Sequence, residues 1–210
     1  MNSKELIGII DYGMGNLRSV SKAVEKLGGL VYVGSDLKKL ERAEKLILPG
    51  VGAFGDAMAE LRKRKLIPLI SDAVRNQKPL LGICLGLQLF FERSAESPSV
   101  KGLGIWKGSV QRFPKQKTKR LKIPHMGWNQ VRLKRNVPIV SRIKDGSYFY
   151  FVHSYFGCPK NVKLVVAKTK YGVEFPSILA SDNTFAVQFH PEKSQNAGLQ
   201  ILKNFIALKR

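Results

Sequence analysis

The sequence predicts an α/β fold: an open, mostly parallel sheet covered by helices on both faces, with antiparallel strands added in the second half. Two observations carry this prediction. In the first half, short apolar runs of strand length alternate with segments whose apolar residues recur at helical spacing. In the second half, strand-like segments follow one another with tight turns between them. The 210 residues contain no repeat or linker, so we expect a single domain over residues 1–210.

Four apolar runs in the first half have the length of buried strands, which is typical of a parallel sheet covered on both faces. They span residues 6–11, 30–34, 45–50 and 79–84. A helix is expected from Leu17, where Asn16 can cap the first turn and Gly28 can end the last one. Further helices are expected over residues 55–76, with a break near Pro68, and over residues 87–95.

The second half is expected to add strands and one closing helix. Strand-like segments span residues 123–133, 147–156, 163–172, 175–183 and 184–190, with turns at 145–146 and 182–183. The final helix carries Leu199, Leu202, Phe205 and Ile206 on one face.

The chain is strongly basic, with 36 Lys and Arg against 15 Asp and Glu and a formal net charge of +21. Such a charge can indicate a polyanion partner such as nucleic acid, or a lysine-rich surface. Most of the basic residues are dispersed. The densest cluster, residues 115–122, has no interleaved aromatic residue on which bases could stack. Docking to an acidic protein face, or to phosphate substrates held by a partner, therefore stays open beside nucleic-acid binding.

The sequence indicates a cytosolic protein without a cofactor. The apolar stretch near the N-terminus is short and is followed at once by Asp11, unlike a signal peptide, and no apolar run reaches the length of a membrane span. Cys84 and Cys158 form no CxxC pattern, and the three histidines are scattered, so neither a zinc site nor a structural disulfide is expected.

Cys84 stands between two glycines where an expected strand passes into a helix. The order Gly-X-Cys-X-Gly resembles a nucleophile elbow, in which glycines allow a sharp turn that leaves the nucleophile at its apex. The N-terminus of the following helix would stabilise a thiolate, and the backbone N–H of Leu85 would be placed to bind an oxyanion. The alternative is a small cysteine buried in a core strand.

A thiolate nucleophile needs a partner that handles protons, and His190 has the most suitable context. It lies at the end of an expected strand, before Pro191 interrupts the ladder. Glu192, two residues on, can orient the imidazole. His153, inside an apolar strand, is more typical of a histidine that lines a core or a pocket. His125 is placed in a Pro/Gly loop, and its role stays open.

A glycine-rich turn follows the third expected strand, in "ILPGVGAFGD" at residues 47–56. It presents bare backbone N–H groups around Val51 and Gly52. On its own it is a weak signal, because glycine-rich turns are common. Beside a strand that ends in Cys84, it becomes a candidate for the second oxyanion donor.

These motifs together resemble the class I (triad) glutamine amidotransferases. The resemblance rests on Cys84 in "GICLGLQ", on "HPEKS" with His190 and Glu192, and on "PGVG". Within that class, four further blocks resemble the glutaminase subunits of imidazole glycerol phosphate synthases, and they cover nearly the whole chain in order. They are "DYGMGNLRSV" at 11–20, "LPGVGAFGDAM" at 48–58, "KIPHMGWN" at 122–129 and "YFVHSY" at 150–155. The resemblance implies a flavodoxin-like sheet.

The resemblance also implies the reaction, which is hydrolysis of the glutamine amide to glutamate and ammonia through a thioester on Cys84. His190 would move the proton and Glu192 would hold His190, while N–H groups of Leu85 and of the Val51–Gly52 turn would bind the oxyanion. In the family this turn is thought to rearrange, which would make activity depend on a partner. The amino-acid end of glutamine would be bound by Gln88 and Glu96, with backbone groups of Gly52 and of the region of Ser154 and Tyr155.

A partner is implied because free ammonia is mostly protonated in water and must pass directly to its acceptor. In the family the acceptor is a (β/α)₈-barrel cyclase subunit, which makes imidazole glycerol phosphate and AICAR in histidine biosynthesis. The residues that the resemblance places at this interface are Asn16, Trp128, Tyr150 and Lys193, although ordinary packing explains each of them equally well.

Two features depart from the family pattern. Leu87 stands where the family often has Met, and the positive charge is unusual for such a subunit. The charge leaves open a paralogous amidotransferase that feeds ammonia to a different barrel, for instance in surface-sugar biosynthesis. The rival hypotheses from other classes are a non-catalytic nucleic-acid-binding protein on the same fold and a cysteine peptidase or hydrolase.

Overall fold

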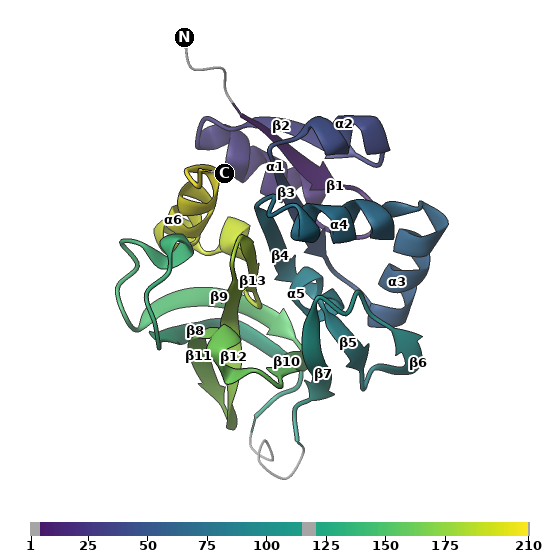
Figure 1. Ribbon diagram of the computed structural model, residues 1–210. Helices are drawn as coiled ribbons and strands as arrows, with labels where there is room; N and C mark the ends of the chain where they lie inside the picture. Colours follow the sequence, from purple (N-terminus) through teal and green to yellow (C-terminus); the bar gives the residue numbers. More distant parts are fainter. Residues whose placement is uncertain (1–4, 115–120, 210) are drawn as a thin grey trace.

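The structure is a computed structural model that describes residues 5–114 and 121–209. Its main sheet has nine strands in the order β2-β1-β3-β4-β13-β12-β11-β8-β9, and a second sheet has the order β10-β7-β5-β6 (Figure 1). The expected α/β architecture, with antiparallel strands added in the second half, is confirmed.

The parallel half of the main sheet is built from apolar runs of four to six residues. These are β1 (Leu6–Ile10), β2 (Leu30–Gly34), β3 (Lys45–Gly50), β4 (Leu80–Cys84) and β13 (Thr184–Val187). Neighbours in the order β2-β1-β3-β4-β13 pair in parallel. Strands β3, β4 and β13 are fully buried, as strands covered on both faces must be.

The antiparallel half extends this sheet beyond β13. It consists of β12 (Val173–Ser181), β11 (Val165–Tyr171), β8 (His125–Leu133) and β9 (Ser147–His153), all paired antiparallel. A tight turn at Asp182 and Asn183 joins β12 to β13, as the sequence predicts. Short 3-10 helices lie at Pro138–Val140 (η2), Val162–Leu164 (η3) and Pro191–Lys193 (η4).

Helices cover both faces of the parallel half. On one face α1 (Leu17–Lys26) packs against α6 (Gln195–Ile206); on the other, α4 (Leu66–Arg75) packs against α2 (Leu37–Arg42) and α3 (Phe54–Lys63) (Figure 1). Two separate apolar clusters result, one on each face of the sheet. The expected cap of α1 is confirmed, because the Asn16 side chain accepts a hydrogen bond from Ser19 N. Gly28 follows the helix with φ +88°.

The expected helix over residues 87–95 is wrong. The helix after Cys84 is α5 (Leu85–Leu89), and the chain then turns into strand β5 (Phe91–Ser94) of the second sheet. There it pairs with β6 (Ser97–Lys101) and with β7 (Trp106–Arg112), while β10 (Tyr155–Pro159) pairs with the other side of β7. Pairing with β7 draws the "FFERS" segment out of the helix.

The expected helix break near Pro68 is also misplaced. The two helices separate at Arg64 and Lys65, where Lys65 has φ +56°. Pro68 lies in the first turn of α4, where backbone N–H groups have no acceptor within the helix, so the missing N–H of proline breaks no hydrogen bond. Helix α2 has no counterpart among the predicted helices, although Asp36 caps it by accepting a hydrogen bond from Lys39 N at 3.1 Å.

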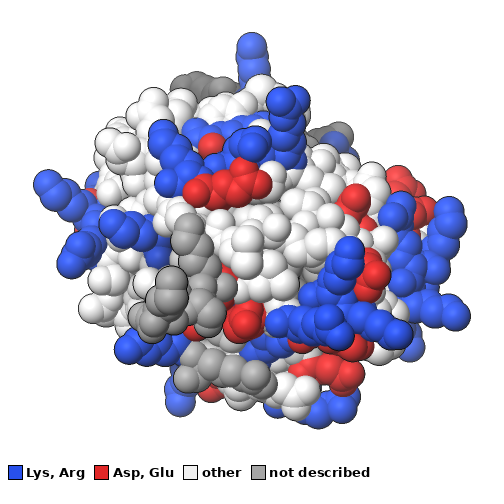
Figure 2. Space-filling view, turned by 90° about the horizontal axis from the view of Figure 1, so that it is seen from above, with Lys and Arg blue, Asp and Glu red and all other residues white. Residues whose placement is uncertain are grey.

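The basic residues are spread over the surface. On the face shown in Figure 2, Lys and Arg form several groups with Asp and Glu among them, and no continuous basic patch covers the face. Most of the predicted cluster at residues 115–122 lies outside the described residues. Within the described ranges, none of the helices is both long and apolar enough to cross a membrane.

Candidate active site

The candidate site lies at the carboxyl ends of three neighbouring strands. Gly50 at the end of β3 pairs with Cys84 at the end of β4, and β13 on the other side of β4 leads within three residues to His190. Open α/β sheets bind their ligands at this edge. The topology therefore brings together the glycine-rich turn, the cysteine and the histidine, which are far apart in the sequence.

Cys84 occupies a strained turn with φ 55° and ψ −105°. The flanking residues Gly82 and Gly86 must be glycines, because neither position has room for a side chain. A Cβ on Gly86 would lie 2.0 Å from the Leu48 carbonyl oxygen, and one on Gly82 would lie 2.9 Å from the backbone of Gly86. A left-handed backbone at a non-glycine residue is typical of functional sites. The geometry therefore matches the elbow that the Gly-X-Cys-X-Gly order predicts.

The cysteine sulfur lies in a largely buried pocket, with 6% of the residue exposed. Its Sγ is 3.9 Å from the Val152 carbonyl oxygen and 3.9 Å from Gln188 Nε2. The side-chain amide of Gln188 can donate a weak hydrogen bond to a thiolate at that distance.

His190 is held by a buried carboxylate. Its Nδ1 is 2.8 Å from Glu192 Oε1, and both side chains are almost completely buried. Since the carboxylate accepts, Nδ1 carries the proton and Nε2 is left for another partner. Ser194 donates from Oγ to the His190 carbonyl oxygen at 2.6 Å, which fixes the backbone of the turn. Within the described residues, His190 Nε2 and Glu192 Oε2 are buried without a hydrogen-bond partner.

The environment favours a charged His190. Burial by itself lowers the pKa of this imidazole, but the interaction with Cys84 across the cavity and the hydrogen bond and charge of Glu192 outweigh it and raise the pKa to about 10. The imidazolium is therefore the stable form of His190 at neutral pH. A thiolate facing an imidazolium is the form in which a cysteine acts as a nucleophile.

A cavity of about 260 Å³ opens in front of the cysteine and the histidine. It contains all the predicted oxyanion and substrate-binding residues, and Glu192 lies behind His190. The lining consists of Val51, Gly52, Cys84, Leu85, Gln88, Glu96, Pro124, Val152, His153, Ser154, Tyr155 and His190. The predicted candidates are thus brought together around one space.

Part of the cavity wall is tied together by polar contacts. Gln88 Nε2 donates to the Tyr155 carbonyl oxygen at 3.0 Å. Glu96 Oε2 accepts from the Phe54 backbone N–H at 2.8 Å, which ties the start of α3 to the cavity. The Glu96 carboxylate of this wall suits a small ligand that carries a charged amino group.

The glycine-rich turn has its backbone close to the helix that follows Cys84. Gly52 has φ +99°, a conformation that glycine adopts without strain. A Cβ on Gly50 would lie 2.3 Å from the Tyr12 hydroxyl oxygen and 3.0 Å from Leu85 Cβ. The turn of Val51 and Gly52 and the start of α5 at Leu85 therefore lie side by side along one cavity.

His125 is the first residue of β8 and stands opposite His153 of β9, so it belongs to the strand expected over residues 123–133 and not to a Pro/Gly loop. Both histidines are buried, and His125 Nδ1 is 3.0 Å from His153 Nε2. Sequence reasoning missed this pair. The alternation of β8 and β9 fixes the face that each histidine occupies, but the register between the strands has no local signal.

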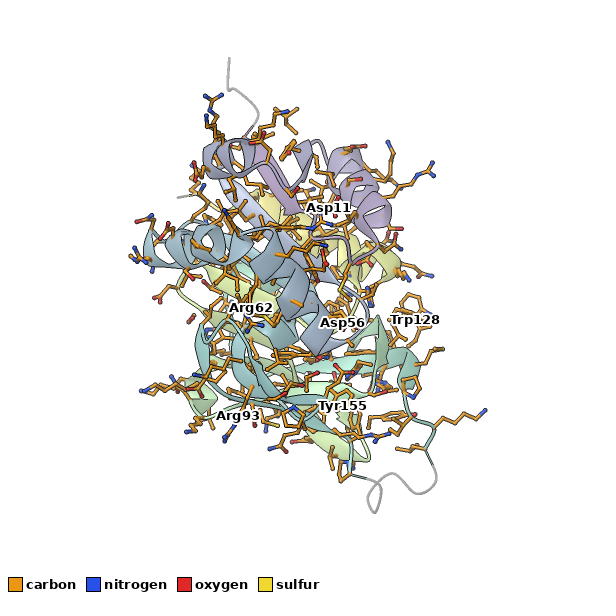
Figure 3. All side chains as sticks on the ribbon, turned by 90° about the vertical axis from the view of Figure 1, so that its right-hand side faces the viewer. Asp11, Asp56, Arg62, Arg93, Trp128 and Tyr155 are labelled. Atoms are coloured by element: carbon orange, nitrogen blue, oxygen red, sulfur yellow. The ribbon has the colours of Figure 1, made fainter. Side chains whose placement is uncertain are left out.

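Three of the four predicted interface residues lie together on the surface. Trp128 pairs with Tyr150 across β8 and β9, their rings are 6.2 Å apart, and Lys193 Nζ lies 5.9 Å from the Tyr150 ring centroid. Trp128 is 46% exposed, and its ring stands clear of the ribbon (Figure 3). Asn16 caps α1, which packs against η4, the 3-10 helix that carries Lys193.

Comparison with known proteins gives one consistent result. Residues 8–208 match the family model "Glutamine amidotransferase class-I". Proteins named "Imidazole glycerol phosphate synthase subunit HisH" are 50% identical over 200 residues in Caldanaerobacter subterraneus subsp. tengcongensis (95% of this chain, 97% of that protein) and 49% identical over 205 residues in Methanocaldococcus jannaschii (97% of this chain, 100% of that protein).

Among solved structures, the fold is similar to PurLQS from Thermotoga maritima, with a TM-score of 0.76 and 21% identity over 97% of this chain and 98% of that one. It is also similar to a glutamine amidotransferase from Thermotoga maritima, with a TM-score of 0.63 and 15% identity over 91% of this chain and 77% of that one. At these identities the likeness concerns the fold alone.

Proposed function

Because the chain belongs to the class-I glutamine amidotransferase family, and within it to the HisH subunits of imidazole glycerol phosphate synthase, we propose that its cavity hydrolyses glutamine through Cys84, His190 and Glu192. One observation carries this proposal. Cys84 and His190 line the same cavity at the ends of adjacent strands, and Glu192 lies 2.8 Å behind the imidazole. Cys84 is thus placed as the nucleophile, His190 as the group that carries its proton, and Glu192 as the acid that orients the imidazole.

The reaction begins with attack of the Cys84 thiolate on the side-chain carbonyl carbon of glutamine. The tetrahedral intermediate collapses when the C–N bond breaks and the His190 imidazolium gives its proton to the leaving nitrogen. The products of this half are ammonia and a γ-glutamyl thioester on Cys84. Neutral His190 then takes a proton from water as the water oxygen attacks the thioester, and glutamate leaves with the thiolate and the imidazolium restored.

Two groups of backbone donors are proposed to bind the oxyanion. One is the N–H of Leu85 in the first turn of α5, where backbone N–H groups have no acceptor within the helix. The other is the turn of Val51 and Gly52, which lines the same cavity. The Leu85 donor is fixed by the helix, whereas the Val51–Gly52 turn is proposed to rearrange in the presence of the partner, as the family resemblance implies, before its N–H groups stabilise the developing negative charge.

Another part of the cavity wall is proposed to bind the amino-acid end of glutamine. Glu96 supplies a carboxylate that can pair with the α-ammonium group, while Gln88 and the backbone at Ser154 and Tyr155 supply hydrogen-bonding groups for the remainder. Because the amide must reach Cys84 from the far end of the side chain, these contacts select a substrate of the length of glutamine.

Ammonia is proposed to pass to a (β/α)₈-barrel cyclase subunit that docks over the cavity in a heterodimer, in the cytoplasm. The aromatic pair Trp128 and Tyr150, with Lys193 beside it and Asn16 nearby, offers an exposed surface of the composition found in protein interfaces. The cyclase would use the ammonia to make imidazole glycerol phosphate and AICAR. The two acceptor hypotheses differ in which barrel accelerates glutamine hydrolysis. A higher rate with the histidine-pathway cyclase supports the first, and a higher rate with a barrel of surface-sugar biosynthesis supports the second.

The test uses the two cysteines as a matched pair. A glutamine-like electrophile is expected to label Cys84 and to be excluded by glutamine, and Cys84→Ala is expected to lose glutamine hydrolysis in the presence of the cyclase. Burial raises the pKa of Cys158 to about 11, so its thiol is a poor nucleophile and Cys158→Ala should keep full activity. Hydrolysis that survives Cys84→Ala would exclude this cysteine as the nucleophile. If the protein hydrolysed peptides but did not hydrolyse glutamine, the peptidase hypothesis would be favoured.

A further inference from the structure

A chain of hydrogen bonds runs through the interior behind the cavity wall. Asn129 Nδ2 is 3.2 Å from His125 Nε2, His125 Nδ1 is 3.0 Å from His153 Nε2, and His153 Nδ1 is 2.8 Å from the Tyr155 carbonyl oxygen. The chain begins on β8, crosses to β9 and ends at the first residue of β10. The hydrolysis proposed above uses none of its three side chains.

The direction of every bond in this chain is fixed from both ends. The Tyr155 carbonyl can only accept, so His153 Nδ1 carries a proton and, in the neutral ring, Nε2 accepts. His125 must therefore donate from Nδ1 and accept at Nε2. The donor to that nitrogen is the amide of Asn129.

The orientation of the Asn129 amide is itself determined. Its Oδ1 accepts from the Gln130 backbone N–H at 2.8 Å, and its Nδ2 donates to the Lys170 carbonyl oxygen at 3.0 Å. An amide turned over would place two acceptors together at Lys170 and two donors together at Gln130. One arrangement of protons, with both imidazoles neutral, satisfies the whole chain.

The surroundings keep both imidazoles neutral. The His125 ring stacks on Tyr171 at 4.0 Å and on Phe151 at 4.8 Å, and the His153 ring lies 5.2 Å from Phe113 and 5.0 Å from Phe175. Burial lowers the pKa of His125 to about 4.

The pKa of His153 falls to about 3, chiefly through burial. The hydrogen bond to Tyr155 opposes this shift, while the charges of His125 and of His190, from the turn after β13, add to it. The phenol of Tyr171 on β11 is the remaining titratable group in ring contact with the pair. Within residues 5–114 and 121–209, no carboxylate makes an ion pair with either ring.

The far end of the chain is part of the cavity. The Tyr155 carbonyl oxygen that accepts from His153 also accepts from Gln88 Nε2 at 3.0 Å. Gln88, His153, Ser154 and Tyr155 all line the cavity. The position of the histidine chain therefore fixes a carbonyl that in turn fixes the Gln88 amide.

We propose that His153, His125 and Asn129 are positioning residues for glutamine binding, because their directed hydrogen bonds hold the Tyr155 carbonyl and through it Gln88 and the Ser154–Tyr155 edge of the pocket. This inference rests on the proposed glutamine site and deepens it. The chain ends at Tyr155 and Gln88, which line the pocket, and it reaches the sulfur only through Gln88, whose Nε2 is 3.5 Å from Gln188 Oε1, and the 3.9 Å contact of Gln188 with Cys84 Sγ. Loss of the chain should therefore weaken substrate binding more than it slows the chemical steps.

The first test compares two variants of one residue, assayed in the full chain with the cyclase present. His153→Phe keeps a ring of similar size but cannot donate to Tyr155, and it is expected to raise KM for glutamine about tenfold, the effect of one lost hydrogen bond, with kcat within about twofold. His153→Asn can place its amide Nδ2 where Nδ1 was, and it should keep KM within about threefold of the parent. Thermal melting of both variants reports whether they fold.

Different results would contradict the positioning role of His153 and the proposed glutaminase function. If Cys84→Ala is inactive while His153→Phe leaves KM unchanged, or if both His153 variants raise KM equally, the positioning role is wrong and the proposed function stands. If the parent does not hydrolyse glutamine, or Cys84→Ala still does, the proposed function itself fails.

A second measurement needs no variant that might fail to fold. In the nitrogen-15 NMR spectrum of the full chain at pH 6, His125 and His153 should both be neutral with the proton on Nδ1, the less common tautomer. Protonation of either ring at that pH, or the Nε2–H form of either ring, would overturn the assignment.

Discussion

The backbone of Leu48 lies directly against Gly86, so closely that a Cβ on Gly86 would stand 2.0 Å from the Leu48 carbonyl oxygen. This contact lets the first turn of α5 sit on the end of β3. It places Leu85 beside Gly50, and it allows the cysteine turn and the glycine-rich turn to face the same cavity. The spacing of glycines around Cys84 is thus a consequence of packing between two strands as well as of backbone strain.

Gly86→Ala should therefore destabilise the protein and remove glutaminase activity. The added methyl group meets a backbone carbonyl, which can yield only if β3 or α5 moves, and overpacking of this kind costs about 1–3 kcal/mol. Melting temperature and glutamine turnover are the measurements. Gly55→Ala in α3 is the control, because its Cβ would meet the movable side chains of Ser97 and Val100. Equal melting temperatures for the two variants would contradict the packing argument.

Tyr12→Phe should stabilise the fold. The Tyr12 hydroxyl is completely buried and has no hydrogen-bond partner among the described residues, and burial also raises the pKa of this phenol. Removing a buried unpaired hydroxyl without leaving a partner behind is expected to gain about 1 kcal/mol in unfolding free energy.

Tyr171→Phe is the matched comparison for Tyr12, because the Tyr171 hydroxyl donates to the Lys122 carbonyl oxygen at 2.7 Å. Its loss should lower the unfolding free energy, so the two substitutions should have opposite signs in denaturant titrations. A loss of stability in Tyr12→Phe would indicate that its hydroxyl has a partner in solution.

Much of the fold could be predicted from the sequence because its signals are local. The four parallel strands of the first half are apolar runs bounded by glycine, proline or charged residues, and Cys84 is marked by the two glycines that its turn requires. The order of the strands then brings the predicted residues around one cavity, since Cys84 and His190 follow neighbouring strands.

The remaining features depend on partners that are distant in sequence. Phe90 and Phe91 look like a continuation of α5, but pairing with β7 makes the latter part of a strand. The His125–His153 contact exists only because β8 and β9 pair in one register, which no short pattern reveals. Pro68 looks like a helix breaker, although the first turn of a helix accepts proline.

Glu192→Gln should lower kcat by about a hundredfold or more, because the neutral amide no longer stabilises the imidazolium or selects its tautomer. Glu192 raises the pKa of His190 through its hydrogen bond and its charge, so the pKa of His190 should be lower in the variant. Turnover against pH measures both effects. Glu174→Gln, which removes only an exposed carboxylate 3.6 Å from Lys168, should leave the profile unchanged. Unaltered kcat in Glu192→Gln would rule out its role behind His190.

The neutral histidine pair should make stability depend on pH in the acid range. Burial lowers the pKa of His153 in the folded protein to about 3, whereas the ordinary value of about 6.5 applies to the unfolded chain. Below pH 6.5 the unfolded state therefore binds a proton that the folded state does not. Stability then falls as pH decreases towards 3, by up to about 1.4 kcal/mol per pH unit for this group.

His153→Phe removes this titration, so its unfolding free energy should fall less steeply than that of the parent between pH 6.5 and pH 4. Carboxylates titrate equally in both proteins, and the difference between the two curves isolates the histidine. The measurement is denaturant unfolding at half-unit pH steps. Parallel curves over this range would mean that His153 is protonated as readily in the folded protein as in the unfolded chain, which its aromatic surroundings and the hydrogen bond that its Nε2 accepts from His125 do not allow.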